Sequence, residues 1–164
     1  MKYEQVSFLS AGVECDAWLF RAAEDSLAND HGRPIVVMAH GLGGTKDSGL
    51  ESFATGLAAA GLDVFAFDYR GFGASAGTPR QVVSMSGQLP DYRAAMDAAA
   101  GLDGVDANRL VLWGVSVSGG TVFAAGADRV DVAAIVSLTP LVDGPAAARH
   151  AMRSHRPSAM ARSG

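Results

Sequence analysis

The segment 110–120, with the sequence LVLWGVSVSGG, combines residue types that suit acyl-transfer chemistry. An apolar, β-favouring run stops at Gly114, and Ser116 follows two residues later. This order predicts a sharp strand-to-helix turn that exposes one serine hydroxyl. A hydroxyl is a weak nucleophile unless a base activates it and hydrogen-bond donors stabilise the oxyanion that forms. The other parts of such a site must therefore come from elsewhere in the chain.

A second segment, His40-Gly41-Leu42-Gly43-Gly44, directly follows the apolar run 34–39. Its glycines let the backbone turn N–H groups outward toward a ligand. In acyl transfer such a loop donates one hydrogen bond to the oxyanion, and the residue after the nucleophile donates the other. We expect these donors to be the backbone N–H groups of Leu42 and Val117. His40 ends the strand, and we expect it to pack and hydrogen-bond rather than act as a base.

A rival register of the first segment makes Ser118 the nucleophile, and a structural reading treats both serines as incidental to a glycine-rich turn. Ser116 is favoured, because the apolar strand ends at Trp113 and a nucleophile should lie within a few residues of that end. Ser118 stands where glycine is usual in the G-x-S-x-G pattern.

The second segment also partly resembles a dinucleotide-binding loop, with Asp68 placed to bind a ribose at the end of the next strand. Lys46 stands where the third glycine of that fingerprint belongs, which disfavours this reading. For the loop that starts at Asp68 we expect a structural role, in which Asp68 and Arg70 pair or cap the turn.

Alternating strands and helices must position these segments. Strands are predicted at 6–9, 15–20, 34–39, 63–69, 110–113 and 132–138, and helices at 48–60, around 89–99 and at 119–126. Alternation of this kind favours a parallel sheet with right-handed crossovers. The first two strands flank Ala11-Gly12 and are predicted to form an antiparallel hairpin. In the helix 48–60, Leu50, Phe53, Leu57 and Ala60 form the expected apolar stripe.

Bulk properties limit the function classes. The chain has 164 residues, is 49% hydrophobic and carries a formal net charge of −4, which favours one folded domain and disfavours nucleic acid or an anionic membrane as a partner. The single cysteine, Cys15, is compatible with a reducing cytoplasm. We expect a domain over residues 1–148. Residues 149–164 lack acidic side chains and are expected to form a basic, disordered tail.

In order and spacing, three motifs resemble the α/β-hydrolase family, and within it the branch of dienelactone hydrolases and Xaa-Pro-peptidase-like enzymes. They are HGLGGTKD at 40–47, DYRGFG at 68–73 and WGVSVSGG at 113–120. The resemblance covers residues 1–148. It implies a three-layer α/β fold with a mostly parallel sheet and an N-terminal antiparallel hairpin. It also implies an esterase, thioesterase, lactonase or peptidase that forms an acyl-enzyme from a small-molecule acyl substrate, without a metal or organic cofactor.

In this family the acid and the histidine of the triad follow later strands than 132–138. We therefore expect a hydrolase domain truncated before its last strands, with impaired catalysis. Asp143 and His150 follow Ser116 in the right chain order and are the candidate substitutes. The alternative is a non-catalytic fragment or pseudo-enzyme that acts as a binding module. Without a later neighbour, the strand 132–138 would also be an exposed apolar edge that invites self-association.

Overall fold

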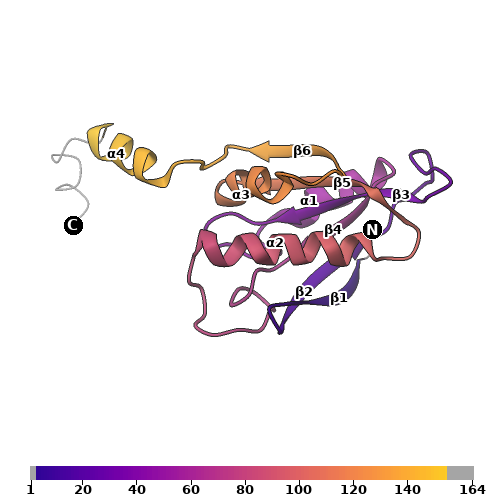
Figure 1. Cartoon of the computed structure of the whole chain (residues 1–164), viewed down its shortest axis with the longest axis horizontal. Coiled ribbons are helices and arrows are strands. Elements are labelled where there is room, and N and C mark those ends of the chain that lie inside the picture. Colours follow the sequence, from indigo (N-terminus) through magenta and orange to yellow (C-terminus); the bar gives the residue numbers. More distant parts are fainter. Residues whose placement is uncertain (1–2, 155–164) are drawn as a thin grey trace.

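A mixed β-sheet forms the centre of the structure. Within residues 3–154, which the computed structural model describes, the sheet has six strands in the order β1-β2-β4-β3-β5-β6 (Figure 1). The strands are β1 (Glu4–Ser10), β2 (Val13–Phe20), β3 (Arg33–Ala39), β4 (Asp63–Phe67), β5 (Val105–Val115) and β6 (Val132–Leu138). The helices are α1 (Leu50–Ala59), α2 (Met85–Ala100), α3 (Val117–Gly126) and α4 (Gly144–Ser154).

Strand pairing confirms the predicted hairpin and parallel sheet. β1 and β2 pair antiparallel around a turn in which Ala11 (φ 48) and Gly12 (φ 77) adopt left-handed backbone conformations. β2 is antiparallel to β4, whereas β3 is parallel to both β4 and β5, and β5 is parallel to β6. The carboxyl ends of β3, β4 and β5 therefore meet at one edge of the sheet, where ligands bind in open α/β sheets.

Helices cover both faces of the sheet and give three layers. α1 packs on one face, where Leu50, Ala54 and Ala58 are buried against side chains of β3 and β4. α2 and α3 pack on the other face, where the buried side chains include Tyr92 and Met96. This arrangement is the α/β-hydrolase architecture that the resemblance implied.

The predicted stripe of α1 is partly wrong. Phe53 and Ala60 are exposed, and Ala54 and Ala58 are buried in their place. The small side chains of Ala54 and Ala58 face the sheet at these positions of α1. Phe53 packs instead against the rim of Trp113, with ring centres 5.2 Å apart.

The carboxyl-terminal part differs from the predicted tail. Residues 149–154, expected to be disordered, form the last turns of α4, which extends away from the sheet (Figure 1). Asp143 stabilises the start of this helix, because its Oδ1 accepts a hydrogen bond from the N–H of Ala146 at 2.8 Å. The rest of the predicted tail, 155–164, lies outside the described residues. None of the helices in the described part has the length and apolarity needed to span a bilayer.

Candidate active site

The backbone turns sharply between β5 and α3 at Ser116. Ser116 has φ 56 and ψ −115, a conformation that non-glycine residues rarely adopt, and α3 begins at Val117. A Cβ atom on Gly114 would lie 2.3 Å from the carbonyl oxygen of Ser118, so only glycine fits at that position. The strand, the strained serine and the following helix form the predicted turn, with Ser116 at its tip.

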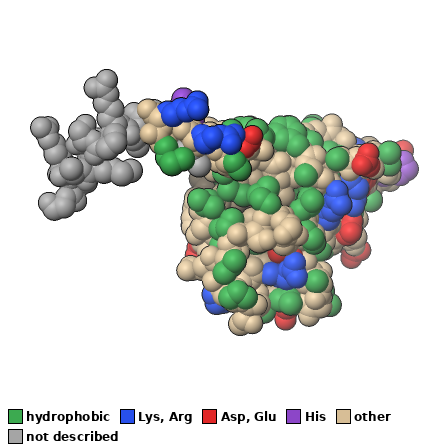
Figure 2. Space-filling view, turned by 60° about the vertical axis from the view of Figure 1, so that its left-hand side comes forward, with side chains coloured by type: hydrophobic (Ala, Val, Ile, Leu, Met, Phe, Trp, Pro, Cys, Tyr) green, Lys and Arg blue, Asp and Glu red, His purple; other side chains and the backbone are tan. Residues whose placement is uncertain are grey.

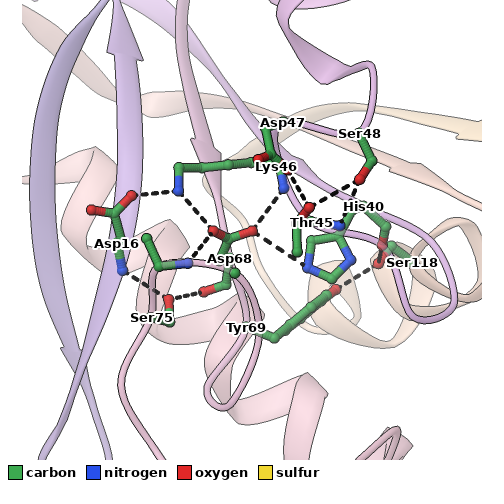
Figure 3. A network of polar contacts seen from close by, with 12 residues as sticks. Asp16, His40, Thr45, Lys46, Asp47, Ser48, Asp68, Tyr69, Ser75 and Ser118 are labelled. Atoms are coloured by element: carbon green, nitrogen blue, oxygen red, sulfur yellow. Dashed lines mark hydrogen bonds and ion pairs between the residues drawn. The ribbon is translucent and has the colours of Figure 1, made fainter. Parts of the chain in front are cut away.

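Ser118 occupies a different environment from Ser116. Its side chain is buried, its Oγ donates to the carbonyl oxygen of His40, and it lies 2.7 Å from the hydroxyl of Tyr69 (Figure 3). Ser116 is only partly buried, and its Oγ has no hydrogen-bond partner within residues 3–154. This contrast favours Ser116 over Ser118 as the nucleophile. It also explains why serine replaces glycine at 118, since its hydroxyl joins the loop at His40 to Tyr69.

The glycine-rich loop after β3 packs directly against the turn. A Cβ atom on Gly41 would lie 3.2 Å from Cβ of Ser116, so the absence of a side chain permits this approach. The next residue, Leu42, has a 65% exposed side chain. Val117 is the first residue of α3, so its N–H has no acceptor within the helix. The geometry thus brings the segments of both proposed oxyanion donors beside Ser116.

A buried polar network holds the glycine-rich loop after β3 in place (Figure 3). Asp68 accepts hydrogen bonds from the backbone N–H of Lys46 at 2.7 Å and from its Nζ at 2.7 Å. The Nζ of Lys46 also forms an ion pair with the carboxylate of Asp16 on β2. Asp68 also accepts from the N–H of Ala74 at 3.1 Å. One carboxylate therefore connects the loop after β3 with the loop after β4.

The sequence interpretation assigned Asp68 correctly to loop capping but named the wrong cation. Arg70 pairs with Asp91 on α2, and Lys46 is the partner of Asp68. The side chain of Lys46 is 4% exposed, an unusual burial for lysine. Although burial opposes its charge, hydrogen bonds to Asp16 and Asp68 raise the pKa of Lys46 above its usual value. The signal in the sequence was the lysine inside a glycine-rich loop.

His40 is positioned as a structural residue rather than as a base. Its Nδ1 lies 2.9 Å from the carbonyl oxygen of Gly41, and its Nε2 lies 3.8 Å from Asp68 Oδ1 without a hydrogen bond. Burial lowers the pKa of the His40 imidazole below 6.5, although Asp68 opposes this shift. A neutral ring whose Nδ1–H donates to Gly41 satisfies this geometry and helps to shape the loop.

The two candidate substitutes for acid and base are not brought together at Ser116. Leu141 N–H donates to the carbonyl oxygen of Ser116 at 2.9 Å, so the chain passes the turn shortly before Asp143. Asp143 then caps α4 with its carboxylate, and His150 is exposed on α4, which leads away from the sheet (Figure 1). In this arrangement neither side chain activates Ser116.

Comparison with known families gives a match over residues 30–161 to the model of the serine aminopeptidase S33 hydrolases. The chain belongs to this family of α/β hydrolases. Membership of this family explains the turn at Ser116. It also disfavours a dinucleotide-binding role for the loop after His40.

Individual relatives agree with this assignment. The chain is 43% identical over 139 residues to the quorum-quenching protein AidA of Acinetobacter baumannii, covering 85% of this chain and 44% of AidA. It is 34% identical over 142 residues to the thiohydrolase aneE of Aspergillus aculeatus, covering 86% of this chain and 42% of aneE. The crystal structure of the α/β hydrolase GrgF from Penicillium superposes with a TM-score of 0.79 at 26% identity, over 94% of this chain and 52% of GrgF. The chain thus spans about half the length of the relatives it matches.

Proposed function

We propose that this chain carries the nucleophile and oxyanion-binding half of a serine hydrolase that acts on carboxylic esters, thioesters or small amides. The observation that carries the proposal is the strained backbone of Ser116 at the end of β5, with the glycine-rich loop packed against it. Strain at such a position is retained when the surrounding structure holds a side chain in place for function.

The proposed reaction begins with attack of Ser116 Oγ on the carbonyl carbon of the substrate. The Oγ proton passes to a base, and the N–H groups of Leu42 and Val117 stabilise the negative charge on the former carbonyl oxygen. Collapse of this intermediate expels the alcohol, thiol or amine, which takes up a proton, and leaves an acyl-enzyme on Ser116. Water then hydrolyses the acyl-enzyme and regenerates the serine.

The base is the missing element within residues 3–154, where Ser116 Oγ has no partner. We therefore infer that the chain by itself turns over substrate slowly, since an oxyanion hole without its triad retains only part of the rate enhancement. Asp143 and His150 could supply a substitute pair only if α4 moved toward Ser116.

Two features support an uncharged acyl substrate, and a third supports a thioester. The carboxyl edge of the sheet comes forward in Figure 2, where hydrophobic and uncharged atoms predominate. Exposed apolar side chains at this edge include Leu42, in the loop after β3, and Met85, the first residue of α2. A thiohydrolase among the relatives supports the inclusion of thioesters.

The assignment to the dienelactone-hydrolase and Xaa-Pro-peptidase-like branch remains a prediction that rests on the motifs. A cytoplasmic location remains a prediction that rests on the lone Cys15.

The experiment is hydrolysis of a p-nitrophenyl ester and of an acyl thioester by the purified chain, by Ser116→Ala and by the matched control Ser52→Ala. Ser52 is exposed on α1, on the opposite face of the sheet from α3. We expect slow turnover that disappears in Ser116→Ala and persists in Ser52→Ala.

The second candidate function is a non-catalytic binding module. It is favoured by the absence of a base beside Ser116 within the described residues. Equal inertness of the wild-type chain and Ser116→Ala would support this candidate and contradict the hydrolase proposal for the chain alone.

A further inference from the structure

A hollow lies between the β1–β2 hairpin and the first half of α2. Its volume is about 570 Å³, and its walls come from the β1–β2 turn, from the loop 70–79 after β4 and from the first half of α2. Most small-molecule sites in proteins have volumes of about 300–1,000 Å³. The hollow, which we call the hairpin cavity, is therefore large enough for a small organic molecule.

The hairpin cavity is separate from the proposed catalytic centre. The residues that line it do not include Ser116, Val117 or Leu42. α2 contacts β1 on one side and α3 on the other, so the helix stands between the cavity and the helix that follows Ser116. β2, which lines the cavity, is separated from β5 by β4 and β3. Three strand spacings correspond to about 14 Å.

An ion pair between Arg70 and Asp91 lines the hairpin cavity. Asp91 accepts from the Nε and backbone N–H of Arg70, the latter at 3.1 Å, and from Ser10 Oγ at 2.5 Å. Arg70 Nη2 also donates to the carbonyl oxygen of Gly87 at 3.2 Å. The charges of Arg70 and Asp91 therefore neutralise each other, and Glu14 adds one negative charge at the exposed rim. This balance disfavours an anionic ligand.

Gln88 is the polar group in the wall whose bonding is incomplete. Its residue is 4% exposed, and its side-chain Oε1 is buried without a hydrogen-bond partner in the described part of the chain. A buried acceptor without a partner costs free energy and calls for an explanation. Oε1 is not accessible from the cavity in this conformation, and pairing with a ligand requires rotation about the last side-chain torsion of Gln88, which is broad in glutamine. A ligand that pairs with this amide would remove the penalty.

The remaining wall is mainly apolar and suits a hydrocarbon body. Val13, Ala76, Pro79 and Val82 contribute side chains, and Val82 is 55% exposed at the opening. Burial of an alkyl chain against these groups contributes roughly 25 cal/mol per Å² of apolar surface removed from water.

We propose that the hairpin cavity binds a neutral, mainly apolar small molecule through a primary or cyclic amide that pairs with the side-chain amide of Gln88. Such a group presents an N–H donor and a carbonyl acceptor side by side, which matches the Oε1 and Nε2 atoms of glutamine. Its apolar body lies between the β1–β2 turn and the loop 70–79. This site is additional to the proposed acyl-substrate site and does not depend on turnover at Ser116.

The test is titration of the isotope-labelled chain with hexanamide, followed by two-dimensional ¹H–¹⁵N NMR. N,N-dimethylhexanamide lacks the N–H donor, and hexanoate and hexylammonium carry opposite charges on the same chain. We expect hexanamide to bind about five- to tenfold more tightly than N,N-dimethylhexanamide, which corresponds to one net hydrogen bond. The perturbed signals should be those of the Gln88 side chain and of Gly77 and Gly87.

Two variants and a matched control locate the site. Gln88→Met keeps the size of the side chain, so the folded chain should not lose stability, but the preference for hexanamide should vanish. Gly87→Leu should weaken binding of both amides at least tenfold by filling the cavity. Gly56→Leu, on a helical glycine of α1 with open space around it, should change neither affinity.

Several outcomes would overturn the proposal. They are equal affinities of the two amides for the wild-type chain, tighter binding of hexanoate or hexylammonium, and perturbations centred on Leu42 and Val117. If Gly87→Leu does not fold, Gln88→Met decides alone, because an unchanged preference for hexanamide in that variant excludes the pairing.

Discussion

The backbone of Ser116 stores strain that a substitution can release. A non-glycine residue in a sparsely populated region with positive φ costs about 1–3 kcal/mol, whereas glycine adopts such conformations freely. We predict that Ser116→Gly is about 1 kcal/mol more stable than Ser116→Ala, because both lack the hydroxyl and only alanine keeps the strain. Urea denaturation of the two variants measures the difference. A more stable Ser116→Ala would show that the turn is not strained.

Ser118 should respond in the opposite way. Its Oγ connects the carbonyl oxygen of His40 with the hydroxyl of Tyr69 in a buried site. Ser118→Ala leaves both groups without this partner, and we predict a loss of about 1–3 kcal/mol of unfolding free energy. The same urea titrations provide the value, and a loss below about 0.5 kcal/mol would contradict the structural role of Ser118.

His40 gives the stability of the chain a pH dependence with a defined sign. Burial holds the pKa of the folded imidazole below 6.5, so below this pH the unfolded chain binds more protons than the folded chain. Stability contributed by the neutral ring is therefore complete at about pH 7 and decreases as the pH falls through 6.5. We predict that His40→Asn has a flatter stability profile between about pH 7 and pH 5 than the wild-type chain. Parallel profiles would contradict this assignment.

At the scale of elements, the Asp68 carboxylate connects the loop after β3 with the loop after β4. Removing one partner of a buried ion pair typically costs about 3–5 kcal/mol, whereas exposed pairs contribute about 0–1 kcal/mol. We predict that Asp68→Asn destabilises the chain by about 3 kcal/mol, since Lys46 then depends on Asp16 alone. The control is Asp25→Asn, whose carboxylate is 76% exposed beside Arg33 and should cost less than about 1 kcal/mol. Thermal unfolding of both variants provides the comparison, and similar losses would refute the anchoring role.

The elements show which features are visible in a sequence and which are not. The existence and order of the strands, the hairpin at Ala11-Gly12 and the turn at Ser116 follow from local apolar runs and glycines, and they were predicted, although residues 105–109 of β5 were not included in the predicted strand. The burial of Lys46 was not, because its partners come from β2 and from the loop after β4. The exposure of Phe53 was also missed, since it depends on how closely α1 approaches the sheet rather than on helical periodicity.

At the scale of the whole molecule, β6 forms one edge of the sheet within residues 3–154, and β1 forms the other. Its residues 133–136 are exposed, and the strand carries neither a charged residue nor a proline that would block pairing with another strand. We propose that two copies associate through this edge as the protein concentration rises. Sedimentation of the wild-type chain should show association that increases with protein concentration.

A charge on β6 should weaken this association. We predict that Val136→Lys sediments as a monomer, while Phe123→Lys, which removes a more exposed apolar side chain from α3 (49% against 37% exposed), associates like the wild-type chain. A wild-type monomer at every concentration, or equal effects of both substitutions, would contradict association through β6.

The central claim concerns which serine is acylated. The most direct measurement is peptide mapping by mass spectrometry after treatment of the chain with a fluorophosphonate. We predict slow labelling of Ser116, because its Oγ lies at the proposed oxyanion-binding turn but has no hydrogen-bonded base within residues 3–154. Labelling of Ser118, or equal labelling of exposed serines such as Ser52, would contradict the assignment of Ser116 as the nucleophile.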